Sequence, residues 1–205
     1  MRRREAPAPW ALLSFLLRYP DEDVAAAREE LEAEVAQLPS GEVRAALQRF
    51  LADWTADPAH FVETFDLRRR ASLHLTYYAH GDTRERGMAL LRLRKLYRVA
   101  GLPMESAELP DHLTVMLAFA ALAPPGHGEA LLAEHRPAIE LLRLSLHDLG
   151  SPYGHLLDAV AACLPALSVS ERSEVARLAH DGPPDEAVGL EPYGPPEAMP
   201  IGARP

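Results

Sequence analysis

Length, composition and charge exclude several classes of protein at the outset. The chain has 205 residues, of which 48% are hydrophobic and only 6% aromatic, and its formal net charge is −9 at pH 7. Non-specific affinity for nucleic acid comes mainly from neutralising phosphates, so this acidic balance argues against a nucleic-acid partner. The single cysteine, Cys163, cannot form an internal disulfide or a cysteine-based metal cluster, which favours a reducing, cytoplasmic location.

The N-terminus resembles a signal peptide only superficially. Arg2-Arg3-Arg4 precedes an apolar run over residues 10–17, but this run is short, follows two prolines and leads into an acidic segment without a small-residue cleavage site. We interpret it as a first amphipathic helix. No run in the sequence approaches the roughly 20 apolar residues of a membrane span, so membrane contact is expected only indirectly, through a partner.

Helix-forming segments follow one another along the chain. Leu and Ala dominate the apolar residues, and both favour helix over strand. Proline, glycine and capping residues separate the segments. We expect helices over residues 10–17, 21–37, 40–54, 58–79 (one helix or a pair), 82–101, 110–123, 128–135, 137–149, 152–164 and 170–180.

Residues that can accept hydrogen bonds from free helix amides precede five of these segments. We expect N-caps at Asp21, Ser40, Asp57, Asp82 and Ser170. Pro58 follows Asp57 at the first helical position, where its missing amide costs nothing. Glu85 stands three residues after Asp82, which is the spacing of a capping box.

The pattern predicts an all-α protein, a single globular helical bundle of about eight to ten helices over residues 1–180. Residues 181–205 are so rich in proline and glycine that we expect a flexible, disordered tail, because little apolar surface remains to offset the entropy of ordering. Composition favours a plain linker there. A short docking motif formed by Val188, Leu190 and Tyr193 stays open as an alternative.

Charge is unevenly distributed along the chain. Acidic residues crowd residues 21–34, whereas residues 68–98 are rich in arginine. At 100° per residue, the helix over 82–101 should bury Ala89, Leu90, Leu93, Leu96, Tyr97 and Ala100, and expose Arg84, Arg94, Lys95 and Arg98. This basic ridge is similar to a recognition helix. The acidic remainder and the lack of a helix-turn-helix pattern argue against DNA binding.

The segment after Pro110 is apolar on all sides and should form a central, buried helix. Its apolar residues are Leu113, Val115, Met116, Leu117, Phe119 and Leu122. Glu108, Asp111 and His112 bring polar groups to the start of this helix, a plausible place for a pocket. Alternatively, the two acids only complement the positive helix terminus while His112 packs against a neighbour. Residue spacing alone favours this second interpretation.

Two motifs carry a resemblance to a known family. The run from Phe65-Asp66 to Gly87 resembles the signature of NarJ-type nitrate reductase assembly chaperones. Glu108-Leu-Pro-Asp-His112 resembles a motif of the wider family, which includes the chaperones of trimethylamine N-oxide and dimethyl sulfoxide reductases. The resemblance covers most of residues 10–123. It implies an all-helical cytoplasmic chaperone that binds the N-terminal segment of the apo catalytic subunit of respiratory nitrate reductase until the molybdenum cofactor is inserted.

The same resemblance implies where the client peptide binds. It places the groove at Glu108, Pro110, Asp111 and His112, with Tyr77 and Tyr78 on a nearby helix. An apolar groove edged by acids would accept a short amphipathic helix with a basic end. The Leu-Phe pair of some relatives is absent at residues 79–81, which puts their groove details in doubt. We expect Asp111→Ala combined with His112→Ala to weaken peptide binding without unfolding the domain.

Catalytic and metal-binding patterns are missing from the sequence. The nine histidines form no His-Glu-x-x-His unit, and Cys163 sits in an apolar helical pattern typical of an inert thiol. There is no Gly-rich phosphate loop, so we expect no bound nucleotide. Because no catalytic or metal-binding pattern is present either, we expect no other cofactor and no enzymatic activity. Two alternatives stay open: a generic helical interaction protein, or a chaperone for a different molybdoenzyme of the dimethyl sulfoxide reductase family. The sequence does not indicate the oligomeric state.

Overall fold

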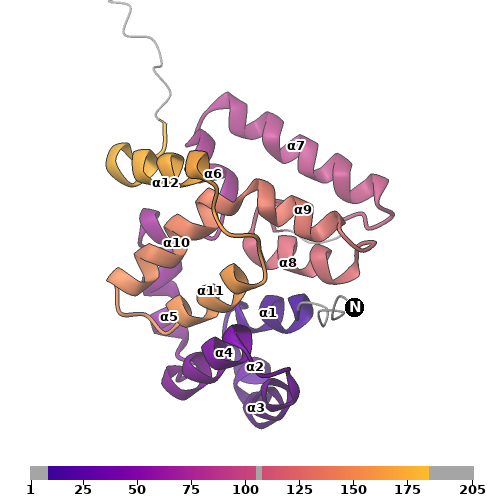
Figure 1. Cartoon of the computed structure of the whole chain (residues 1–205), viewed down its shortest axis with the longest axis vertical. Helices are drawn as coiled ribbons and strands as arrows, with labels where there is room; N and C mark the ends of the chain where they lie inside the picture. Colours follow the sequence, from indigo (N-terminus) through magenta and orange to yellow (C-terminus); the bar gives the residue numbers. More distant parts are fainter. Residues whose placement is uncertain (1–8, 105–107, 185–205) are drawn as a thin grey trace, which may run out of the picture.

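The described residues, 9–104 and 108–184 of a computed structural model, form twelve α-helices and one short 3₁₀ helix (Figure 1). The helices are α1 (Trp10–Leu16), α2 (Glu22–Ala26), α3 (Arg28–Gln37), α4 (Glu42–Asp53), α5 (Pro58–Phe65), η1 (Arg69–Ala71), α6 (Leu75–His80), α7 (Arg84–Val99), α8 (Leu113–Leu122), α9 (His127–Glu134), α10 (Arg136–Asp148), α11 (Tyr153–Ala162) and α12 (Val169–Asp181). The all-α class is confirmed. None of these helices is both long and apolar enough to cross a membrane.

The number of helices exceeds the expected eight to ten because two predicted segments are divided. The segment over 21–37 breaks at Ala27, which separates α2 from α3. The segment over 58–79 forms α5, η1 and α6. Almost all of the predicted tail, including Val188, Leu190 and Tyr193, lies outside the described residues.

The core forms where α1 packs on α8, α4 on α11, and α10 on both α11 and α12. Tyr153, at the start of α11, is 1% exposed and stands at the centre of an aromatic cluster. Its ring lies 4.9 Å from that of Phe65, 5.5 Å from Phe50 and 5.7 Å from Phe61. The indole N–H of Trp54 donates to its hydroxyl at 3.1 Å, so the polar end of this buried ring is satisfied.

The predicted N-cap residue is confirmed at two of the five helices for which one was expected. Asp21 accepts from the Val24 N–H and Asp57 from the Ala59 N–H, each at 2.9 Å. At α4 the prediction of Ser40 is wrong, because Gly41 is the N-cap residue and no side chain caps the helix.

The capping box expected at the start of α7 is also wrong. Thr83 is the N-cap residue there, and its hydroxyl donates backwards to the His80 carbonyl at 2.8 Å. Asp82 pairs instead with Arg86 at 3.1 Å.

At α12 the cap is Ser168 rather than Ser170. Ser168 and Glu171 form a capping box, and Glu171 accepts from the Ser168 N–H at 2.7 Å. The box needs an acid three residues after the cap, and of the two serines only Ser168 has one at that position.

The long helix α7 lies at one end of the molecule, with α2 and α3 at the opposite end (Figure 1). Its predicted buried face is confirmed at Ala89, Leu93 and Tyr97, whereas Leu96 is 38% exposed. The predicted basic ridge is exposed, as are the apolar side chains of Met88, Leu91 and Val99. The central position of α8 is confirmed as well, except that Leu122, at its end, reaches solvent.

Candidate functional site

The two sequence motifs meet in a short backbone pairing. His74, just before α6, and His112, just before α8, form an isolated antiparallel β-bridge. Two main-chain hydrogen bonds, of 2.9 and 3.0 Å, connect residues 73–75 with residues 111–113. This pairing explains why α8 begins at Leu113 and not at the predicted Pro110, because an extended segment cannot also be helical.

Asp111 lies at the centre of this junction and is fully buried. Its Oδ1 atom is 3.1 Å from Nδ1 of His74, while its Oδ2 accepts a 2.5 Å hydrogen bond from the Thr76 hydroxyl. A terminal nitrogen of Arg86 is 3.6 Å from Oδ2. Burial acts to raise the pKa of Asp111, but the hydrogen bonds from His74 and Thr76 and the charge of Arg86 outweigh it, so the pKa is lowered. The ionised carboxylate therefore ties α6, α7 and the segment before α8 together.

The other motif residues differ in exposure. Glu108 is exposed, and its carboxylate accepts from the Leu109 N–H at 3.1 Å. Pro110 is buried, and its carbonyl accepts from the Tyr97 hydroxyl at 2.7 Å, which holds this segment against α7. His112 is half-buried. Glu108 and part of His112 are therefore the polar side chains of the motif that solvent can reach.

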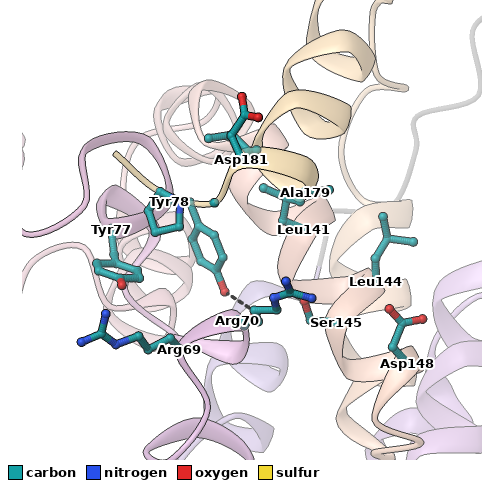
Figure 2. A pocket seen from close by; sticks show the side chains of 13 residues that line it. Arg69, Arg70, Tyr77, Tyr78, Leu141, Leu144, Ser145, Asp148, Ala179 and Asp181 are labelled. Atoms are coloured by element: carbon teal, nitrogen blue, oxygen red, sulfur yellow. Dashed lines mark hydrogen bonds between the residues drawn. The ribbon is translucent and has the colours of Figure 1, made fainter. Parts of the chain in front are cut away.

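A pocket of about 450 Å³ lies among α6, α10 and α12. Figure 2 shows Tyr78 directed towards Arg70 and α10, Tyr77 farther from α10 and beside Arg69, and α12 above. The apolar walls come from Leu141, Leu144 and Leu178, and the charged groups are Arg69, Arg70, Asp148 and Asp181. The site thus combines an apolar floor with charges of both signs at its edge.

The two tyrosines have different roles in this pocket. Tyr78 is buried, and its hydroxyl is within hydrogen-bonding distance of the carbonyls of Arg70 and Ser72, at 3.1 and 3.0 Å. Tyr77 is half-buried, and the guanidinium of Arg86 lies 5.7 Å from its ring centroid, as in a cation–π contact. Tyr78 is thus held within the wall, whereas part of the Tyr77 side chain is open to solvent. Because Arg86 also contacts Asp111, Tyr77 connects the pocket with the buried junction.

Comparison with known proteins identifies the family. The family model described as nitrate reductase delta subunit matches residues 20–158, more than half of the chain. The chain belongs to the nitrate reductase delta subunit family. The matched region includes the aromatic cluster, the Asp111 junction and the α6 and α10 walls of the pocket.

Several curated members of the delta subunit family are similar to this chain. The nitrate reductase-like protein NarX of Mycobacterium tuberculosis is 38% identical over 153 residues, which cover 74% of this chain but only 23% of NarX. The probable nitrate reductase molybdenum cofactor assembly chaperone NarJ of Bacillus subtilis is 30% identical over 181 residues, 86% of this chain and 98% of that protein. NarJ of Escherichia coli is 36% identical over 155 residues, 72% of this chain and 65% of that protein.

The resemblance placed four residues at a groove and two tyrosines on a nearby helix, and in this delta subunit family member the six differ in position and exposure. Tyr77 and Tyr78 line the pocket, Pro110 and Asp111 are buried, and Glu108 and His112 lie at the β-bridge side of α6. Sequence reasoning missed the walls from α10 and α12, because nothing in their apolar pattern distinguishes a pocket wall from core. It also missed Thr76 and Arg86 as partners of Asp111, since residues 35 and 25 positions away become neighbours only in the fold.

The burial of His112 predicts acid sensitivity. Burial lowers the pKa of His112 below its ordinary 6.5, and the carboxylates of Glu108 and Asp111 act in the opposite direction without outweighing it. The folded state thus favours the neutral ring, so this contribution to stability is present above pH 6.5 and is lost as the pH falls through the lowered pKa. We expect His112→Gln to reduce the loss of stability between pH 7 and pH 5, measured by urea unfolding at both values. If the variant and the unaltered chain lose the same free energy of unfolding between the two pH values, His112 is not the source of the acid sensitivity.

Proposed function

We propose that the chain is a cytoplasmic chaperone of respiratory nitrate reductase assembly. It binds the N-terminal segment of the apo catalytic subunit and keeps that subunit competent for molybdenum cofactor insertion. The observation that carries the proposal is the match with the Bacillus subtilis assembly chaperone, which extends over 98% of that protein. The chaperone contacts the membrane only through its client, and it acts by binding alone, without enzymatic activity.

The pocket between α6, α10 and α12 supports the proposal because its chemistry suits an amphipathic helix. Leu144, which is 40% exposed, offers an apolar surface to the buried face of such a helix, and the buried side chains of Leu141 and Leu178 line the pocket beside it. Asp148 and Asp181 lie beside this surface and complement a basic end of the peptide. We therefore propose that the client peptide lies along this pocket.

The six residues singled out in the sequence take separate parts in this proposal. Tyr77 contacts the peptide directly, and Tyr78 shapes the wall behind it. Glu108 and His112 form an outer contact, at the β-bridge side of α6, for a longer peptide. Pro110 and Asp111 hold this part of the chain in place from the interior.

Removing the Tyr77 ring should weaken client binding. We expect Tyr77→Ala to lower the affinity for the N-terminal peptide of the nitrate reductase catalytic subunit by about tenfold, because a central aromatic anchor contributes more than 1 kcal/mol. The measurement is a calorimetric titration of the full chain with this peptide. Tyr19→Ala is the matched control, since Tyr19 is 49% exposed and packs on Phe61, outside the pocket.

Two outcomes would count against the proposal in different ways. If the unaltered chain does not bind the peptide, the proposed client is wrong. If it binds and both tyrosine variants bind equally well, the proposed position of the peptide is wrong. Tighter binding of the N-terminal peptide of a trimethylamine N-oxide or dimethyl sulfoxide reductase would favour the alternative, a chaperone for another molybdoenzyme of that family.

A further inference from the structure

Two histidines and a carboxylate converge where α10 passes into α11. His147 lies in the last turn of α10, and His155 and Asp158 face it from α11. Nε2 of His147 is 2.9 Å from Oδ1 of Asp158, and Nδ1 of His155 is 3.4 Å from Oδ2. One ligand atom from each residue lies within 4.8 Å of the others. This spacing requires only small side-chain rotations before all three atoms can contact one ion.

We propose that His147, His155 and Asp158 bind a divalent transition-metal ion such as Zn²⁺, which joins the end of α10 to the first turns of α11. Two imidazoles and one carboxylate are a ligand set that suits zinc and its neighbours, whereas Mg²⁺ and Ca²⁺ prefer oxygen atoms alone. The three side chains are between 22% and 35% exposed. Water can therefore reach the ion and complete its coordination.

A second carboxylate supports the role of His155 as a ligand. Oδ2 of Asp53, at the end of α4, is 3.8 Å from Nε2 of His155. Histidines that bind metals commonly donate their other ring N–H to a carboxylate, which fixes the tautomer and orients the ring. This distance is too long for a hydrogen bond, but the negative charge of Asp53 attracts a proton on Nε2, and the tautomer protonated there carries its lone pair on Nδ1, the atom nearer Asp158.

The surroundings of the cluster position the other two ligands. The His147 ring lies directly against Gly154, where an added Cβ would come 3.0 Å from Nδ1. Arg143 donates to Oδ1 of Asp158 at 2.8 Å but also holds Glu140 at 2.7 Å, so its charge remains paired when Asp158 binds an ion through Oδ2.

The test is a calorimetric titration of the full, tag-free chain with ZnCl₂ at pH 7.5, together with thermal unfolding. We expect one equivalent of Zn²⁺ to bind and the unfolding temperature to rise by about 5–10 °C at a hundredfold excess over the dissociation constant. His147→Ala and His155→Ala should each lower the affinity by at least about tenfold, and Asp53→Asn by about tenfold. Because protons compete with a metal ion for imidazole nitrogen, the binding should weaken as the pH is lowered.

His180→Ala is the matched control, because His180 is exposed on α12 and lies outside the cluster. It should bind Zn²⁺ as the unaltered chain does. Circular dichroism of each variant without metal confirms that the fold is intact, and His147→Gln replaces His147→Ala if that variant unfolds. The proposal is overturned if Zn²⁺ neither binds nor raises the unfolding temperature, or if the His147 and His155 variants bind it as well as the control. Peptide titration of the same variants is a separate readout, so failure of this site leaves the proposed client untouched.

Discussion

Replacing Asp111 with alanine should lower the free energy of unfolding by about 3–5 kcal/mol, the usual cost of removing one partner from a buried ion pair. The substitution leaves the Thr76 hydroxyl without its acceptor and removes the carboxylate from His74 and Arg86. Arg86 is affected most, because its side chain is only 17% exposed and water cannot easily take the place of the carboxylate. The measurement is urea unfolding at pH 7, followed by circular dichroism.

Asp82→Ala provides a matched control, because Asp82 pairs with the same guanidinium from the solvent side. The side chain of Asp82 is 71% exposed, and an exposed pair of this kind contributes at most about 1 kcal/mol. A similar small loss in both variants would show that the Asp111 junction does not hold α6 and α7 together.

This result bears on the peptide-binding test as well. The sequence led us to expect that Asp111→Ala with His112→Ala weakens binding without unfolding the domain. Because Asp111 is fully buried and has three partners, we now expect that double substitution to destabilise the domain first. Tyr77, which is half-buried and lines the pocket, is therefore the sharper probe of client binding.

Much of the fold was predictable because capping residues, prolines and glycines mark the same helix ends as the spacing of the apolar residues. Asp57-Pro58 specifies the start of α5 through a side-chain cap and a proline that lacks only a dispensable amide. Gly101, with φ of +78°, stands just beyond α7, where the left-handed conformation suits glycine. Each of these features depends on residues close in sequence, so it can be read without the fold.

The remaining features depend on contacts distant in sequence. Residues 110–112 read as the first turn of a helix, but pairing with residues 73–75 makes His112 extended, so the turn at residues 109–112 does not continue into α8. The pocket wall from α10 and the cluster at His147 and His155 arise from helix packing that the sequence does not encode in any one segment. The proposed metal site in particular was not expected, because its histidines are eight residues apart on two helices rather than at i and i+4 on one.

Gly128 is a further position at which only the fold shows what the residue does. It begins no turn and has no positive φ, yet an added Cβ would lie 2.3 Å from the Ala120 Cα and 2.5 Å from its Cβ. These atoms belong to the backbone of α8 and to a side chain that cannot rotate away. The glycine therefore sets the distance between α8 and α9, which pack against each other.

We expect Gly128→Ala to lower the free energy of unfolding by about 3 kcal/mol, because α8 and α9 must separate to admit one methyl group and the core must follow. Gly87→Ala is the control: Gly87 lies within α7 with nothing within 4 Å of its would-be Cβ, so alanine should instead stabilise by about 0.5–1 kcal/mol through its helix propensity. Urea unfolding of both variants measures whether each substitution lowers or raises the free energy of unfolding. If Gly128→Ala is neutral or stabilising, the close approach of α8 and α9 does not exist in solution, and the position of α8 beneath the Asp111 junction must be reconsidered.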